Sequence, residues 1–382
     1  MKRLIVVSSL FPNREQPTKG IFNKHRVSHL LNHFDVKVIS PLPWGLQREL
    51  PAKDTIDNIA VDYPRYFMIP KIGRSLYGFF YGLSLFPFMK RLFKQFSWDA
   101  MLVNWAYPDA FGMMIINRFF RRPLFIYVLG SDINIYTRFF LRRLLIVSAL
   151  KKATKVFAVA DQLRDKMVAL GVDKDAIVVV QTGVDTDIFY PMDKTRCREQ
   201  LGLPIEKKVV LFVGGLVPVK GLPFLMEAAR LLIKKNKDLI FLMIGDGKDR
   251  KSLQRTIAQG QMEKAVFLLG GKPHSEIPLW MNTCDLFCLP SLSEGCPNVV
   301  MEALACGRPV VGTDVGDVSR LILKGTGGGY VVPPKNSQAL SEAIDRALGQ
   351  TWDSAQLSEL ILEYRWDRTA EKISTEIKKH LV

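Results

Sequence analysis

Short apolar runs alternate with amphipathic stretches along the whole chain, and this alternation constrains the fold more than any other feature. In the first half, apolar runs of strand length are separated by stretches with helical spacing of apolar residues, as in GIFNKHRVSHLLNHF at 20–34. The strand-like runs lie at 2–9, 36–43, 99–105, 123–130, 155–160 and 176–181. Strands that alternate with helices are typical of a parallel sheet covered by helices on both faces.

A second alternation of the same kind follows a polar, turn-rich segment at 183–193. Its strand-like runs lie at 208–216, 238–247, 265–271, 285–291 and 308–316. We therefore predict an α/β fold of two doubly wound, Rossmann-like domains that face each other across a cleft. The predicted domains are residues 1–185 and residues 186–365, and we expect a C-terminal helix over 366–382 to pack back on the first domain. Ligands of such sheets bind at the carboxyl ends of the strands, so the cleft is the expected site.

The stretch EGCPNVVMEALACGRPVV, which begins at Glu294, places a helix directly after one of these strands. Pro297 suits the first helical position, and Gly307 suits the stop. The helix is expected from 297 to 306. Its first amides, near three residues of the opening turn, combine with the helix dipole to favour an anion such as a diphosphate. These residues are Asn298, Val299 and Val300.

Two acids flank this helix start. Glu294 precedes it in the loop, and Glu302 follows in the second turn. Carboxylates are strong acceptors for sugar hydroxyls, so the pair could hold hydroxyls on either side of a diphosphate. The alternative is that Glu294 is a solvated loop acid and Glu302 a solvated acid on the helix surface.

The longer stretch PSLSEGCPNVVMEALACGRPVVGTDVG resembles the signature of the retaining glycosyltransferases of family 4, which have the GT-B fold of two Rossmann domains. The resemblance extends over nearly the whole chain and is of the bacterial surface-polysaccharide type. It includes FPNREQPTKGIFNKH, LGSDIN, QTGVDTDIFYP, VGGLVPVKG, IGDGKDR and GYVVPPKN.

This resemblance implies roles for five residues. Glu302 would bind the ribose hydroxyls of a sugar nucleotide, and Glu294 would contact the donor sugar. Lys220 would contact the diphosphate and offset its charge as it leaves. Gly20 and its loop would approach the diphosphate from the first domain, where a glycine allows close backbone approach. Asp132 would face the acceptor.

The chain departs from the family pattern at three positions. Gly215 stands where the family usually has an arginine that accompanies the lysine at the phosphate. Leu129 stands where a histidine often precedes the G-S-D triplet, and Arg320 stands where a glutamate is common. Arg320 could supply the charge that is missing at Gly215.

The positive charge is concentrated in the first half. Residues 1–190 hold 27 basic and 15 acidic residues, a net charge of +12, whereas residues 191–382 hold 26 and 22, a net charge of +4. Within 63–155 the chain has 15 bases and 3 acids. Such a surface suits anionic lipid, nucleic acid or a phosphorylated substrate.

Residues 63–98 combine twelve aromatic residues and six bases with no acid. One interpretation is a helix in a membrane interface, with the bases on anionic headgroups. The other is a core helix with solvated basic ends. The bases are Arg65, Lys71, Arg74, Lys90, Arg91 and Lys94, and the arginines at 118, 121, 122, 138, 142 and 143 would extend the basic face. No nucleic-acid motif is present, so we expect no nucleic-acid partner.

No apolar run reaches the roughly 20 residues that a spanning helix needs, and no signal peptide is evident. We expect a cytoplasmic protein, peripheral on the inner face of the cell membrane. The five cysteines lack zinc-site spacing and are expected to be reduced. The D-x-D at Asp185 and Asp187 lies in the linker, so no metal and no cofactor are expected.

Together these features predict a retaining, metal-independent glycosyltransferase of the hexosyltransferase type. It would move a sugar from a UDP- or GDP-linked donor to an acceptor hydroxyl, on a lipid-linked glycan in cell-surface polysaccharide synthesis. Two alternatives stay open: a sugar-nucleotide epimerase of the same fold, and a non-catalytic membrane-associated scaffold.

Overall fold

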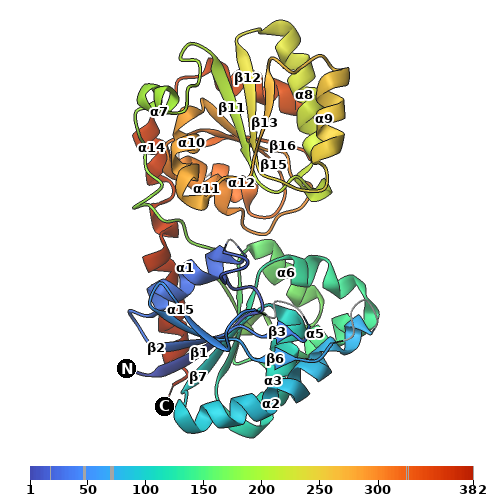
Figure 1. The fold of residues 1–382 in the computed structure, drawn as a ribbon, viewed down its shortest axis with the longest axis vertical. Coiled ribbons are helices and arrows are strands. Elements are labelled where there is room, and N and C mark those ends of the chain that lie inside the picture. Colours follow the sequence, from blue (N-terminus) through green and yellow to red (C-terminus); the bar gives the residue numbers. More distant parts are fainter. Residues whose placement is uncertain (18, 46–48, 69–72, 324, 326, 382) are drawn as a thin grey trace. The chain divides into compact units, whose positions relative to one another are not determined.

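The computed structural model describes residues 1–17, 19–45, 49–68, 73–323, 325 and 327–381. The chain divides into two compact units (Figure 1). Unit 1 is Met1–Gly183 together with Trp366–Val382, and unit 2 is Val184–Arg365. Each unit is an α/β sheet with its own helices. Among the described residues, no helix is both long enough and apolar enough to cross a membrane.

Unit 1 is built on an eight-stranded sheet of order β10-β9-β8-β7-β1-β2-β5-β4. Its strands are β1 (Arg3–Val7), β2 (Asp35–Ile39), β4 (Lys53–Ile56), β5 (Ile59–Asp62), β7 (Ala100–Asn104), β8 (Leu124–Val128), β9 (Lys155–Ala158) and β10 (Ile177–Val179). All neighbours pair in parallel except β4, which runs antiparallel to β5 at the edge. The inner strands β7 and β8 are buried along their whole length, as expected of a sheet with both faces covered.

The main helices of unit 1 are α1 (Ile21–Leu30), α2 (Tyr77–Gln95), α3 (Phe111–Phe120), α5 (Phe140–Lys152), α6 (Asp161–Ala169) and α15 (Trp366–Lys378). The C-terminal helix α15, red in Figure 1, lies beside α1, which is blue. Trp366 anchors it, because its ring stacks on His25 with centroids 6.0 Å apart. A Cβ on Gly183 would lie 2.4 Å from the same ring, so only a glycine fits there.

The aromatic helix α2 is amphipathic and packs closely on α3. Its buried face includes Tyr81, Leu85 and Met89, all fully buried. A Cβ on Gly112 of α3 would lie 2.6 Å from the Tyr81 ring, which shows how near the two helices approach. This side of α2 therefore belongs to the core of unit 1, whereas Leu83 on the other side is 71% exposed. Lys71, one of the six bases noted above, lies outside the described residues.

Unit 2 is built on a six-stranded parallel sheet of order β13-β12-β11-β14-β15-β16. The strands are β11 (Lys208–Val213), β12 (Leu239–Ile244), β13 (Val266–Gly270), β14 (Leu286–Leu289), β15 (Val310–Thr313) and β16 (Gly329–Val332). The helices are α7 (Lys194–Gln200), α8 (Leu222–Lys235), α9 (Arg250–Gln259), α10 (Ile277–Thr283), α11 (Asn298–Ala305), α12 (Val318–Ile322), α13 (Ser337–Gly349) and α14 (Ser354–Glu359). The apolar strands of this sheet form one continuous core with α8, α11 and α13.

Candidate active site

The loops that follow three adjacent strands of unit 2 interlock at the carboxyl edge of the sheet. After β11 and β14, the Leu292 amide donates to the Val219 carbonyl at 2.7 Å. After β14 and β15, the Asp317 amide donates to the Gly295 carbonyl at 2.8 Å. Gly221 has a φ of +63°, and a Cβ there would lie 2.0 Å from the Pro290 carbonyl oxygen. The contacts fix the loops relative to one another.

The two glycine-rich motifs after β11 and β12 pack on each other in the same way. The Leu216 amide donates to the Asp246 carbonyl at 2.9 Å. A Cβ on Gly245, whose φ is +141°, would lie 2.0 Å from the Gly214 carbonyl oxygen. The Asp246 carboxylate accepts from the Gly271 amide at 2.7 Å and so ties in the loop after β13. The motifs VGGL and IGDG are therefore needed for backbone packing at this edge of the sheet.

Lys220 and Glu294 meet at this interlocked edge. The Lys220 Nζ donates to Glu294 Oε1 at 2.7 Å, and the Ser291 hydroxyl donates to the same oxygen at 2.5 Å. The side chains of Lys220 and Glu294 are 21% and 12% exposed. Two residues expected to contact the donor thus lie side by side. Ser291 was not predicted, although it stands three residues before the acid.

The start of α11 differs slightly from the prediction. The helix spans Asn298–Ala305, and Pro297 is its N-cap with a ψ of 108°, not its first helical residue. The Val300 amide donates to the Pro297 carbonyl at 3.1 Å, so the prediction that this amide is available to an anion is wrong. Gly307 ends the helix as expected, with a φ of +65°. Asn298 and Val299 lie in the first turn, directly after the loop that carries Glu294.

Glu302 lies in the second turn of α11 and is only 8% exposed, so it is not a solvated surface acid. Its Oε1 lies 3.4 Å from Nε2 of His274, which follows β13. The His274 ring also contacts Phe189, edge to face, with centroids 5.4 Å apart. Nothing in the sequence around His274 marked it as a partner of Glu302, because the two are brought together only by the order of the strands.

Gly215 and Arg320 represent two departures from the family pattern. A Cβ on Gly215 would have no heavy atom nearer than 3.9 Å, and its φ is not positive, so the position has room for a side chain. Arg320 is exposed on α12. Burial raises the pKa of Tyr364 well above its usual range, and the Arg320 charge opposes that rise. The role expected of Arg320 at the phosphate stays a prediction.

Asp132 belongs to unit 1, and its surroundings correct the expectation that its side chain faces an acceptor. The residue is fully buried. Its carboxylate accepts from the amides of Ala106, Leu129, Gly130 and Ile133 at 2.8–3.2 Å. Burial raises the pKa of this carboxyl, and the four amide bonds oppose the rise. Asp132 thus organises the loop after β8, and Leu129 takes part through its amide.

Gly20, also in unit 1, is the N-cap of α1 and has a φ of +65°. A Cβ there would lie 2.3 Å from the Leu10 carbonyl oxygen. The close approach of the loop after β1 to the start of α1 therefore requires a glycine, independently of any ligand.

A buried acid that the sequence did not single out, Asp109, lies at the carboxyl edge of the unit 1 sheet, after β7. Asp109 is fully buried, and Ser9 donates to its carboxylate from the amide at 2.8 Å and from the hydroxyl at 2.6 Å. Burial raises the pKa of Asp109 to about 6, although the bonds from Ser9 lower it. The acid fixes the loop after β1 to the loop after β7.

The described residues contain no cluster of three histidine, cysteine, aspartate or glutamate side chains that could hold a metal ion. None of the five cysteines forms a disulfide, and Cys296 is the most exposed of them. The absence of a metal from the reaction stays a prediction.

Comparison with known families assigns both units. Residues 193–361 match the family Glycosyl transferases group 1, and residues 25–188 match Glycosyltransferase Family 4. A putative teichuronic acid biosynthesis glycosyltransferase of Bacillus subtilis, TuaC, is 28% identical over 377 residues, covering 90% of this chain and 88% of its own. The amylovoran biosynthesis glycosyltransferase AmsK of Erwinia amylovora is 28% identical over 302 residues, covering 75% and 69%.

Among solved structures, HepE (Alr3699) of Anabaena in complex with UDP has a TM-score of 0.79 at 20% sequence identity, covering 99% of this chain and 100% of HepE. This similarity confirms the predicted α/β fold class of two Rossmann-like domains. The two family matches and these relatives place the chain among the sugar-transferring enzymes. The chain belongs to the GT-B glycosyltransferases of the family 4 type.

Proposed function

We propose that this glycosyltransferase moves a sugar from a nucleotide-diphosphate sugar to an acceptor hydroxyl with retention of configuration at the sugar. The observation that carries the proposal is the pairing of Lys220 with Glu294 at 2.7 Å, at the carboxyl edge of the unit 2 sheet. Ligands of parallel α/β sheets bind at this edge. The pair combines a cation suited to phosphate with an anion suited to sugar hydroxyls.

In the proposed complex each residue of the site has one task. Lys220 contacts the diphosphate, together with the first turn of α11 at Asn298 and Val299, where the helix dipole favours an anion. Glu294 accepts hydrogen bonds from the donor sugar, and Glu302 accepts them from the ribose. Because Glu294 and Lys220 are already held by neighbouring loops, little reorganisation is needed when the donor binds.

The proposed transfer needs neither a metal nor a cofactor. The bond between the anomeric carbon and the diphosphate oxygen breaks, and the diphosphate leaves with the electron pair. Lys220 stabilises the charge that develops on it. The acceptor oxygen forms the new bond on the same face, and its proton passes to the departing phosphate oxygen. Asp132 and Gly20 support the acceptor half of the enzyme by shaping the loops of unit 1.

The names of the relatives support a role in surface polysaccharide synthesis. TuaC is named for teichuronic acid and AmsK for amylovoran, and HepE was solved with UDP. We therefore propose a UDP- or GDP-linked donor and a lipid-linked glycan acceptor. The proposed location is the cytoplasmic face of the cell membrane.

A basic and apolar surface at the start of α5 supports membrane association. Phe139, Phe140 and Leu144 are 51%, 67% and 50% exposed. Arg142 lies over the Phe139 ring at 4.3 Å, and Arg143 lies over the Phe140 ring at 5.7 Å. Exposed aromatic side chains with arginines beside them suit a surface of anionic lipid. We propose that this surface, the α5 patch of residues 138–144, contacts the membrane.

The first experiment is a thermal-shift panel with UDP, GDP, ADP and their sugar conjugates in the presence of EDTA. A ligand that binds only the folded state raises the unfolding temperature. A shift with one nucleotide that is lost in Lys220→Ala and Glu302→Ala is expected. Product analysis then separates the alternatives, since an epimerase releases an altered sugar nucleotide without an acceptor and a scaffold turns over no donor. Full transfer activity in Glu294→Gln, Glu302→Ala and Lys220→Ala would contradict the site assignment.

A further inference from the structure

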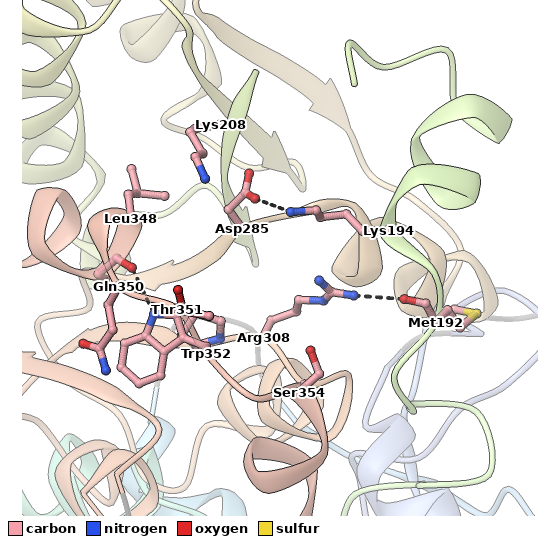
Figure 2. A pocket seen from close by; sticks show the side chains of 13 residues that line it. Met192, Lys194, Lys208, Asp285, Arg308, Leu348, Gln350, Thr351, Trp352 and Ser354 are labelled. Carbon is pink, nitrogen blue, oxygen red and sulfur yellow. Dashed lines mark hydrogen bonds and ion pairs between the residues drawn. The ribbon is translucent and has the colours of Figure 1, made fainter. Parts of the chain in front are cut away.

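A pocket of about 440 Å³ opens at the amino edge of the unit 2 sheet (Figure 2). Lys208 begins β11, Asp285 directly precedes β14, and Pro309 directly precedes β15, and all three line it. Lys220 and Glu294 follow β11 and β14 instead. The strands are parallel, so the pocket and the candidate active site lie at opposite ends of the sheet.

The pocket carries an excess of positive charge. Lys194, Lys208 and Arg308 line it together with a single acid, Asp285. That acid is already saturated, because its carboxylate accepts from Lys194 at 2.6 Å, from Arg198 at 2.7 Å and from the Val209 amide at 2.8 Å. Lys208 has no ion pair or side-chain hydrogen bond with the described part of the chain. An anion that enters the pocket therefore meets cations that Asp285 does not fully neutralise.

Arg308 is the central cation of the pocket in Figure 2. It is only 8% exposed, and its Nη2 donates to the Met192 carbonyl at 3.1 Å and to Asn282 Oδ1 at 3.0 Å. Its Nε is buried and has no hydrogen-bond partner among the described residues. Leaving a buried donor of a charged group unsatisfied is costly, so the Arg308 guanidinium carries charge that its protein partners do not fully satisfy.

The facing wall offers groups that suit a polyhydroxylated molecule. Gln350, Thr351 and Ser354 contribute polar side chains, and Trp352 contributes its ring. The ring is fixed because Trp352 Nε1 donates to the Ala347 carbonyl at 2.9 Å. Indole rings are flat apolar surfaces against which the C–H face of a sugar can pack. The volume is that of a pocket for a small ligand.

We propose that this pocket is a second, non-catalytic site for a small sugar phosphate, with the phosphate on Arg308 and Lys208 and the sugar against Trp352. Arginine and lysine are suited to phosphate oxygens through charge-assisted hydrogen bonds. The ligand class follows from three kinds of lining group: the cations Lys208 and Arg308, the polar side chains and one fixed aromatic ring.

The site is placed to influence donor binding through α11. This helix begins at Asn298 beside the Glu294 loop, carries Glu302, and ends at Ala305, three residues before Arg308. Gly307 is packed against the pocket wall, since a Cβ there would lie 2.6 Å from Ser354 Cβ. This coupling rests on the proposed function, whereas the site itself does not. A ligand that shifts the position of α11 changes donor affinity, and the donor then changes the affinity of that ligand by the same factor.

Glucose 6-phosphate is the probe, and glucose and inorganic phosphate are the comparison ligands. At millimolar concentration, we expect glucose 6-phosphate to raise the unfolding temperature of the full chain more than either comparison ligand does. The affinity measured by calorimetry should fall about tenfold in Lys208→Glu, which reverses one charge in the pocket. Lys251→Glu, an exposed lysine on α9 that does not line the pocket, is the matched control and should bind as the parent does.

Two further variants make the outcome decisive. Arg308→Lys keeps the charge but removes the buried Nε, and it should also weaken the binding of glucose 6-phosphate. Lys220→Ala should leave glucose 6-phosphate binding intact, which separates this pocket from the candidate active site even if no nucleotide binds. An equal shift in Lys208→Glu, Arg308→Lys and the parent would overturn the proposal, as would no shift at all or a shift with inorganic phosphate alone.

Discussion

The Lys220 ammonium lies 2.7 Å from the Glu294 carboxylate, and the Ser291 hydroxyl donates to the same carboxylate oxygen. Glu294→Gln keeps the shape of the side chain but removes its charge, so the acceptor for the donor sugar becomes weaker. We expect the turnover of the donor to fall by roughly 10²–10³, the range seen when one preorganised polar contact is removed from an active site. The measurement is the initial rate of nucleoside diphosphate release. The turnover of Ser291→Ala should fall much less. A larger fall in Ser291→Ala than in Glu294→Gln would contradict the assignment.

His274 should act through Glu302, which it approaches to 3.4 Å. His274→Ala removes this contact and leaves the Glu302 side chain less ordered. We expect donor affinity to weaken about three- to tenfold, the loss of one hydrogen bond, with a smaller change in the rate at saturating donor. His380→Ala, in the C-terminal segment of unit 1, is the control. Unchanged affinity for the nucleotide in His274→Ala would exclude a role in positioning.

Gly215→Arg should restore a cation near the phosphate without disturbing the fold. The nearest atoms to a Cβ at this position are 3.9 Å away, so the substitution needs no rearrangement. We expect an unchanged unfolding temperature and a tighter complex with the nucleoside diphosphate, measured by calorimetry. Gly245→Ala is the contrast, because its Cβ would lie 2.0 Å from the Gly214 carbonyl oxygen. That variant should lose about 1–3 kcal/mol of stability or more.

Asp109 should make unit 1 less stable as the pH rises. Its pKa is about 6 in the folded protein because the carboxyl is buried, and the ordinary value is 3.8. Between these values the folded state keeps the proton that the unfolded state has lost, so stability falls with rising pH and then levels above about pH 6. The loss is about 2–3 kcal/mol. Below 3.8 both states hold the proton, so the contribution vanishes.

Asp109→Asn keeps an acceptor for the Ser9 amide and cannot ionise. Urea unfolding of the parent and the variant at several pH values isolates this one group, because all other titrations are shared. We expect the free energy of unfolding of Asp109→Asn to rise relative to that of the parent as the pH rises from about 4 to about 6. Parallel curves for the two proteins would show that Asp109 does not titrate in this range.

The α5 patch should decide membrane binding. Phe140→Ser combined with Leu144→Ser removes two exposed apolar side chains, which are 67% and 50% exposed. We expect binding to vesicles that contain anionic phosphatidylglycerol to fall about tenfold or more, because inserted apolar area is lost. Phe267→Ser, in unit 2 and 38% exposed, is the matched control. Equal loss in the control, or equal binding to neutral vesicles, would contradict the proposal.

The strands were the part of the fold most readily predicted from the sequence. The stretches 209–213 and 239–244 are apolar throughout because both faces of the sheet are covered, and they make up nearly all of β11 and β12. The edge hairpin of β4 and β5 was not predicted, because KDTI contains two adjacent charged residues and only one apolar residue and so resembles a loop. Strands at the edge of a sheet are less buried than central strands, so their residues need not be apolar.

The site was predictable where neighbours in the chain are also neighbours in space, as at Glu294 and the start of α11. The bond between Glu302 and His274 was not, since 28 residues separate them. The surroundings of Asp132 were misjudged for a related reason. A polar triplet at the end of a strand indicates a turn. The sequence does not show whether the acid faces a ligand or, as here, three amides of its own loop and the Ala106 amide after β7.

The two ends of unit 2 are held together, because the Val184 amide donates to the Tyr364 carbonyl at 2.8 Å. In unit 1, Gly183 packs closely against the Trp366 ring. Unit 2 is thus inserted in the chain of unit 1, and the points where the chain enters and leaves unit 2 lie next to each other. A gene that joins Gly183 to Trp366 by a short turn, and a second that encodes residues 184–365 alone, would therefore separate the two halves of the enzyme into independent proteins. Unit 2 of one enzyme can then be combined with unit 1 of a related enzyme to make a chimera.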